Sequence, residues 1–258
     1  MRKPWFWIAL GGLVVSLAAA PDRNVARTRI ANGFDFPVGK PNADGYYKAR
    51  GFRAGGHPGE DWNGIGGGNS DLGDPVYCIG DGMVIFSRDV RMGWGNVVIV
   101  RHVYVEKGEL KTVDSFYAHL NKITVKDGQQ IRRGDQLGTI GTNRGMYPAH
   151  LHFEIRKNLF IGINRSAFRR DLSNYFVPTD FITPLRTIKG GGRSALIAIN
   201  TFGPNQGLNG PGTGSDLKTQ TAKNIPKLSS DRSSTPPKVS TSRRSTFKVD
   251  RFGEVESF

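Results

Sequence analysis

Short runs of β-branched and aromatic residues, separated by glycine turns, constrain the fold of this chain more than any other feature. No long segment among them repeats apolar residues at i, i+3, i+4 and i+7, as an amphipathic helix would. Short runs with turn signals between them are typical of antiparallel β domains. Strands are therefore expected over residues 76–80, 83–87, 96–103, 112–120 and 150–156, with two more inside 126–141.

The first twenty residues have the composition of an export signal. Arg2 and Lys3 precede an apolar run from Trp5 to Leu17, and small residues follow. Secretory signal peptides have this order of segments, and the run is shorter than the roughly 20 residues that span a bilayer. Two interpretations stay open, a signal peptide that is cleaved and an N-terminal membrane anchor that is retained. Both predict an exported protein, in the periplasm or cell envelope or outside the cell.

The other end of the chain is polar. Residues 205–258 are rich in Ser, Thr, Pro, Gly and basic residues and show no hydrophobic period. Such a segment cannot bury enough apolar surface to offset the entropy lost on ordering it. We predict a disordered basic tail here, serving either as a tether or as an arm that binds anionic cell-wall polymers.

Charge and cysteine content limit the classes of partner and site. Lys and Arg number 36 against 22 Asp and Glu, so the net charge is +14, and basic surfaces favour polyanions. No basic motif with interleaved aromatics is present, so we expect no specific nucleic-acid partner. The single cysteine, Cys78, excludes an intramolecular disulfide and a cysteine-built metal cluster. We expect Cys78 to be a small core residue and the protein to be a monomer.

Four of the five histidines fall in three short motifs: HPGED (57–61), YAHL (117–120) and AHLHFEI (149–155). On a strand, side chains at i and i+2 share a face, so His150 and His152 project together while Leu151 and Phe153 face the core. Two imidazoles and a carboxylate could supply the three protein ligands of a catalytic zinc site. The remaining histidine, His102, has no such context and is expected to be structural.

The ordered set HPGED, YAHL and HLHFE resembles the lysostaphin-type (LytM-like) zinc metallopeptidases, which cut peptidoglycan peptides. The resemblance covers about residues 51–157. It implies a compact antiparallel β fold like the duplicated hybrid motif, with the site in a groove on one sheet. It also implies one Zn²⁺ per chain and a peptidoglycan peptide as substrate.

Carried over by position, the resemblance makes His57, Asp61 and His152 the zinc ligands, and His119 and His150 the catalytic pair beside the metal. All five positions are filled, which favours an active endopeptidase. The alternative is an inactive relative that binds peptidoglycan or activates another hydrolase. The division of roles between the two catalytic histidines stays open, as does the bond that is cut.

Residues next to these motifs allow further expectations. Glu60 adjoins Asp61, so its side chain should point away from the site. Tyr117 either contacts substrate or packs in the core, and residues 64–68 (GIGGG) suit a flexible loop along the groove. The loop TNRGMYPAH (142–150) departs from the family pattern, which leaves substrate preference open.

We therefore expect one catalytic domain with extensions at both ends. Residues 21–56 could cover the groove as an inhibitory segment, and a short helix or loop is expected over Ser166–Tyr175. The expected segments are a signal peptide or anchor (1–20), an N-terminal extension (21–50), the metallopeptidase catalytic β domain (51–160), a C-terminal extension packed on it (161–204) and the disordered tail (205–258).

Overall fold

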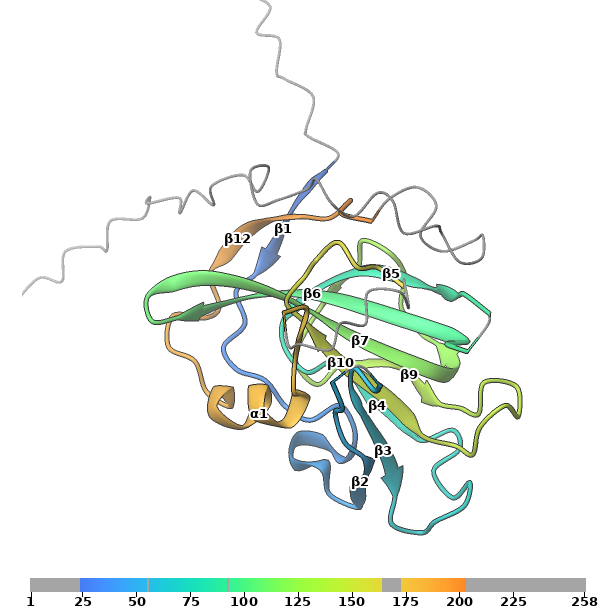
Figure 1. Ribbon diagram of the computed structural model, residues 1–258. Helices are drawn as coiled ribbons and strands as arrows, with labels where there is room; N and C mark the ends of the chain where they lie inside the picture. The colour runs from blue at the N-terminus through green and yellow to red at the C-terminus, as the bar shows by residue number, and fades with distance from the viewer. Residues whose placement is uncertain (1–23, 55, 92, 164–172, 203–258) are drawn as a thin grey trace, which may run out of the picture.

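The structure, a computed structural model, describes residues 24–54, 56–91, 93–163 and 173–202 (Figure 1). The export-type segment, the basic tail and most of residues 166–175 lie outside these ranges. Within them, no helix has both the length and the apolar character needed to cross a membrane.

Antiparallel pairing joins most of the described strands into one large sheet. Its main path runs β2 (Tyr46–Arg50), β3 (Glu60–Gly64), β10 (Leu151–Arg156), β7 (Glu109–Ile123), β6 (Asn96–Glu106), β5 (Gly82–Asp89) and β8 (Gln130–Ile131). Off this path, β11 (Tyr175–Phe176) pairs with β10, and β9 (Gln136–Ile140) pairs with both β7 and β4 (Pro75–Tyr77). The prediction of a mainly antiparallel β fold is confirmed, and the strand-type runs from 76 to 156 all contribute strands.

Two apolar clusters cover the two faces of the large sheet. On β7, Tyr117 enters the main core, whereas Phe116 and Ala118 enter a smaller cluster on the opposite face. The strands at the centre of the sheet are consequently buried on both sides. Cys78 lies in the main core with no exposed surface, as the sequence predicted. Tyr117 packs there too, and its hydroxyl accepts a hydrogen bond from the Ile79 amide (3.1 Å).

Strand β10 shows how alternation positions the functional groups. Leu151, Phe153 and Ile155 pack into the main core, because every second side chain of a strand lies on one face. His152, Glu154 and Arg156 lie on the opposite face and are also buried. A row of three polar side chains is thus held inside the protein on one strand.

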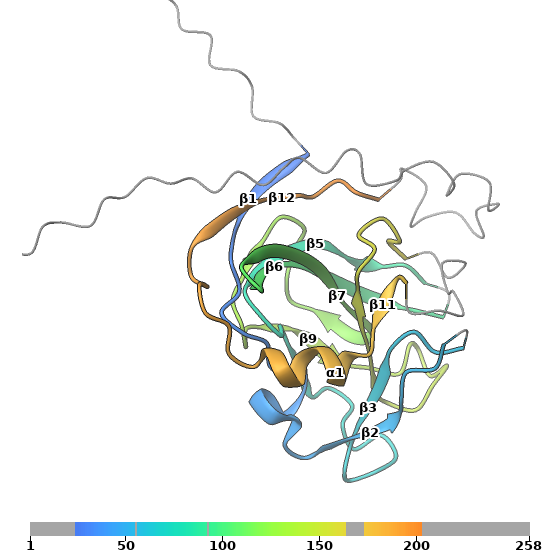
Figure 2. The same cartoon turned by 60° about the vertical axis from the view of Figure 1, so that its left-hand side comes forward.

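Both chain extensions take part in the fold. β1 (Val25–Arg29) pairs with β12 (Ser194–Ala198) in a two-stranded sheet that lies along one side of the large sheet (Figures 1 and 2). β2 precedes residue 51 yet is an edge strand of the large sheet, so no break in the sheet marks the expected start of the catalytic domain. The sequence analysis did not predict these three strands, nor the short helices η1 (Gly39–Ala43), α1 (Pro178–Ile182) and η3 (Thr183–Leu185).

A buried arginine ties the C-terminal extension to the sheet. The guanidinium of Arg101 on β6 donates two hydrogen bonds to the Asp114 carboxylate on β7, at 2.7 and 2.6 Å. It also donates to the carbonyl oxygens of Ala198 and Leu159 and to the Thr201 hydroxyl. Because burying an unpaired charge is costly, these bonds hold residues 198–201 in place against the sheet.

His102 is structural in this fold. It has no exposed surface, its Nδ1 donates to the Asp81 carbonyl oxygen (3.0 Å), and its Nε2 accepts from the Ser115 hydroxyl (2.7 Å). Burial lowers the pKa of His102 from 6.5 to about 4, because the interior disfavours the charged form. The folded protein therefore holds this imidazole neutral, whereas the unfolded chain protonates it at a higher pH.

This difference predicts a loss of stability in mild acid. Between pH 6.5 and 4 the unfolded state binds a proton that folded His102 does not bind, so the free energy of unfolding falls as pH falls. The loss from this group should be roughly 3 kcal/mol by pH 4, at about 1.4 kcal/mol per pKa unit. Denaturant unfolding at pH 7 and pH 4 should show a smaller loss for His102→Gln than for the wild type. Equal losses would refute the assignment.

Candidate metal centre

The pairing of β3 with β10 brings two functional side chains together. Asp61 and His152 are direct partners in the antiparallel register, so both side chains project from the same face of the sheet. His57 comes from the loop before β3, which turns back through a pair of backbone hydrogen bonds between Arg53 and His57. Gly59 makes this approach feasible, since a Cβ there would lie 2.2 Å from the carbonyl oxygen of Phe153.

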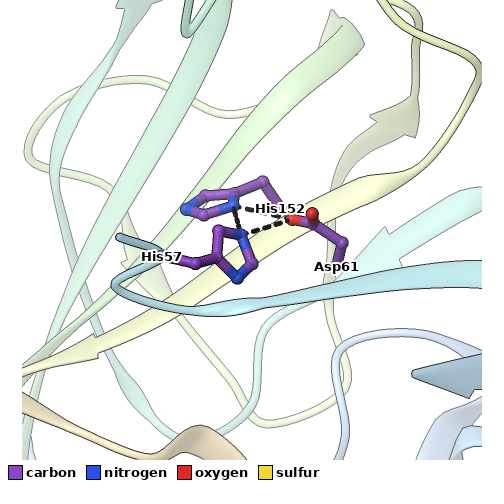
Figure 3. A group of neighbouring side chains, drawn as sticks. All are labelled: His57, Asp61 and His152. Carbon is purple, nitrogen blue, oxygen red and sulfur yellow. Dashed lines mark hydrogen bonds and ion pairs between the residues drawn. The ribbon is translucent and has the colours of Figure 1, made fainter. Parts of the chain in front are cut away.

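The three side chains converge on one point (Figure 3). Asp61 Oδ1 lies 3.0 Å from His57 Nε2 and 2.8 Å from His152 Nδ1, and the two nitrogens are 3.1 Å apart. Tetrahedral Zn²⁺ with bonds of about 2.0–2.1 Å holds its ligand atoms about 3.3 Å apart. Two imidazole nitrogens and a carboxylate oxygen at these separations fit zinc after a shift of a few tenths of an ångström.

Hydrogen bonds on the far side of each ring orient the histidines. His57 Nδ1 lies 2.9 Å from the Gly51 carbonyl oxygen, and His152 Nε2 lies 2.9 Å from Glu154 Oε1. A ring that donates its N–H to such an acceptor presents the lone pair of its other nitrogen to a metal. Both lone pairs then point toward Asp61, which is the arrangement a cation requires.

Glu154 was not singled out by the sequence analysis, although it lies two residues after His152. It has no exposed surface, and its Oε2 accepts a hydrogen bond from Arg156 Nε at 2.6 Å. The guanidinium of Arg156 lies 3.8 Å from the centre of the Phe116 ring, which fixes it in turn. The signal in the sequence was the alternation His152-x-Glu154-x-Arg156, which puts all three side chains on one face.

The electrostatics favour ionised carboxylates around His152. Burial raises the pKa of Asp61, but its hydrogen bonds to His152 and His57 outweigh burial and hold that pKa well below its usual range. Burial likewise raises the pKa of Glu154, and the Arg156 charge and His152 more than offset it. For His152 burial lowers the pKa, whereas the bonds to Asp61 and Glu154 raise it above its ordinary value. The centre is therefore rich in negative charge that suits a cation.

His119 and His150 lie beside these three residues. Their ring centres are 4.8 Å apart, and His150 Nε2 is 3.9 Å from Asp61 Oδ1. His119 Nδ1 lies 3.2 Å from the Trp94 carbonyl oxygen, and His150 Nδ1 lies 2.8 Å from that of Pro148. Burial lowers the pKa of His119 to about 3, so this imidazole is neutral at neutral pH.

His119 reaches the site only because β7 is irregular. Strict alternation after Tyr117 would direct His119 into the main core. Instead its φ is +61°, and the register of β7 shifts near this point. An irregularity of this kind redirects a side chain and often occurs next to functional sites. All five sequence-predicted site residues thus surround one point, although His119 does so against the strand period.

Two aromatic residues complete the wall of the site. The Trp94 ring stacks on His119, with centres 6.2 Å apart, and lies 5.1 Å from the His152 ring. The Tyr147 ring centre is 4.8 Å from that of His119 and 5.9 Å from that of His150. Neither residue was identified from the sequence as part of the site. The Trp94 ring covers His119 and His152, and the Tyr147 ring covers His119 and His150.

Glu60 lies on the other face of β3. It has no exposed surface, and its carboxylate accepts hydrogen bonds from Lys48 Nζ (3.0 Å) and from the Thr179 hydroxyl (2.8 Å). This orientation is the one expected for a strand neighbour of Asp61. Glu60 is therefore a buried carboxylate without a part in the centre.

Comparisons with known proteins confirm the family resemblance. Residues 58–164 match peptidase family M23. Over 84 residues, 33% of this chain and 18% of the relative, the sequence is 37% identical to the peptidoglycan DD-endopeptidase ShyA of Vibrio cholerae. Over 86 residues, 33% of this chain and 20% of the relative, it is 31% identical to the murein hydrolase activator NlpD of Salmonella dublin. The aligned segment spans about a fifth of the length of these relatives.

Among solved structures, the chain is similar to the catalytic domain of the antimicrobial peptidase lysostaphin from Staphylococcus simulans. The two share 25% sequence identity with a TM-score of 0.40, over 53% of this chain and 92% of that one.

The bond from Glu154 to His152 predicts a specific loss of metal affinity. Glu154→Gln removes the charge that orients His152, so zinc should bind about 10–100-fold more weakly. Glu60→Gln is the matched control, because it neutralises a carboxylate that is equally buried on the neighbouring strand but faces away. Competition with a chelator of known affinity measures both variants. The same affinity change in both, or none in Glu154→Gln, would contradict the orienting role.

Proposed function

Since residues 58–164 match peptidase family M23, we propose that this protein is a zinc endopeptidase which hydrolyses peptide cross-links of peptidoglycan. The observation that carries the proposal is the convergence of two imidazoles and one carboxylate beside two further histidines. The relative named as a peptidoglycan DD-endopeptidase supports the substrate class.

Zn²⁺ bound by His57, Asp61 and His152 would polarise the scissile carbonyl and lower the pKa of a water molecule toward 7. The chain itself prepares this chemistry. The Gly51 carbonyl and Glu154 hold the two ring tautomers that direct lone pairs inward. The ionised Asp61 adds the negative charge that favours binding of the cation.

His150 and His119 are suited to different tasks. Both donate Nδ1–H to a backbone carbonyl, which leaves each Nε2 free to accept a proton or a hydrogen bond. His150 is the more exposed ring, and its Nε2 lies 3.9 Å from Asp61 Oδ1, beside the proposed zinc ligands. It is therefore assigned to take the proton of the attacking water and deliver one to the leaving amine. His119, enclosed by aromatic rings, is assigned to orient that water.

We also propose that the protein is exported, is a monomer and binds the cell wall. The signal-like residues 1–20 carry the chain to the compartment where peptidoglycan lies, whether the segment is cleaved or retained. The tail over 205–258 has nine Lys and Arg against five Asp and Glu, and this positive charge supports attraction to anionic wall polymers.

A second candidate function is activation of another hydrolase. The match to a murein hydrolase activator favours it. The two functions differ in whether the chain itself breaks a peptide bond.

Zinc content and digestion of peptidoglycan together decide between the two. Purified protein lacking residues 1–20 should contain one zinc per chain and release new peptide termini, detected by mass analysis. Removal of the metal with a chelator should abolish cleavage, and added Zn²⁺ should restore it. Bound zinc without cleavage would favour the activator function. If the protein neither contains zinc nor cleaves peptidoglycan, the proposed enzyme function is refuted.

Single substitutions should separate metal binding from proton transfer. His152→Ala should lose both zinc and activity. His150→Ala should keep zinc while the cleavage rate falls by about 10²–10⁴, the contribution typical of a general acid–base. His102→Gln is the control, a buried histidine away from the site that should keep both. Full activity in His152→Ala would contradict the ligand assignment.

A further inference from the structure

A pocket of about 660 Å³ lies between two loops next to the metal centre. Its lining residues are Asp89, Arg91, Asn143, Arg144, Gly145 and Met146. Each loop leads directly to the site. Three residues after Arg91, Trp94 stacks on His119, and three residues after Arg144, Tyr147 packs against the same ring. The pocket is therefore close in the chain to the two aromatic residues that pack against His119, and it has room for one amino-acid side chain or terminus.

The two loops are held together across the pocket. The carboxylate of Asp89 accepts one hydrogen bond from the Arg91 amide (2.7 Å) and another from Arg144 Nη2. Gly95, with φ at +64°, brings the first loop close to the second, since a Cβ there would lie 2.5 Å from Asn143 Oδ1. The lining groups are thus positioned before any ligand arrives.

The charge of the pocket favours an anion. Two arginines, Arg91 and Arg144, and one aspartate, Asp89, line the pocket, which gives its lining a net charge of +1. Arg144 has five N–H donors, and one of them binds Asp89. Its side chain is 59% exposed, so the other donors are accessible. A planar fork of N–H groups matches the two oxygens of a carboxylate.

We propose that this pocket binds a free carboxylate of the peptide substrate, with Arg144 and Arg91 as donors and exposed Met146 against the adjoining aliphatic part. This inference rests on the proposed function and specifies its substrate. A cross-link between acidic stem peptides carries a carboxylate near the bond that is cut, whereas a bridge built of glycine alone carries none. The protein is accordingly assigned to acidic cross-links.

Two synthetic peptides test the proposal on the zinc-loaded protein. They are identical except for a free carboxylate or a carboxamide next to the scissile bond. The wild type should cleave the carboxylate peptide at least about tenfold more efficiently in kcat/KM, as expected for a charge-assisted hydrogen bond. The double variant Arg91→Gln with Arg144→Gln should bring this ratio close to one. High salt should reduce the wild-type ratio, because the pocket is exposed.

Arg88→Gln is the matched control. Like Arg144, Arg88 is an exposed arginine that pairs with an aspartate, in this case Asp127. Arg88 lies on β5 and lines a separate pocket. The Arg88→Gln variant should leave the ratio of kcat/KM values for the two peptides unchanged. A wild-type ratio near one, or a ratio that survives the double variant, would overturn the subsite.

Failure of the proposed function would be distinguishable. If the protein cleaves neither peptide, that function is wrong, and binding of the two peptides followed by NMR then tests the subsite alone. Tighter binding of the carboxylate peptide, lost in the double variant, would support the subsite. Equal binding of both peptides would overturn it.

Discussion

The antiparallel register between β3 and β10 is the constraint on which the rest of the site depends. It sets Asp61 directly opposite His152, and the glycine at position 59 lets the preceding loop pack close enough for His57 to join them. A slip of one residue would exchange His152 with Leu151, so an apolar side chain would face the centre and an imidazole would enter the core. Burial of the apolar side chains on one face of β10 therefore fixes the strand register that keeps His152 opposite Asp61 on the other face.

The polar row on β10 extends this dependence into the interior. Glu154 orients His152, Arg156 neutralises Glu154, and Phe116 supports Arg156. Buried charges of this kind are costly unless each one is paired, so the row acts as a unit. Rigid support behind a metal ligand is what keeps a binding geometry in place before the metal arrives. The stability of the sheet and the chemistry of the site thus rest on the same side chains.

The residues proposed for recognition lie on different elements from the proposed metal ligands. Asp61 and His152 lie on central strands, whereas Trp94, Tyr147 and the arginines of the adjoining pocket lie on two loops. Loops vary more readily than the strands that carry them. The departure of residues 142–150 from the family pattern falls in one of these loops, where under the proposed function a change would alter peptide binding rather than the proposed metal ligands.

The sequence alone determined the features that follow from local periodicity. These are the mainly β fold and the two faces of β10, whereas the five residues that surround one point were identified by the resemblance of their motifs to a known family. The tertiary structure decided what depends on distant partners: the pairing of Val25 with Ala198, the entry of β2 into the sheet and the bond of Glu154 to His152. It also decided the orientation of His119, whose positive φ overrides the strand period. Alternation is a property of neighbouring residues, whereas pairing and backbone irregularity are stabilised by contacts between segments far apart in the chain.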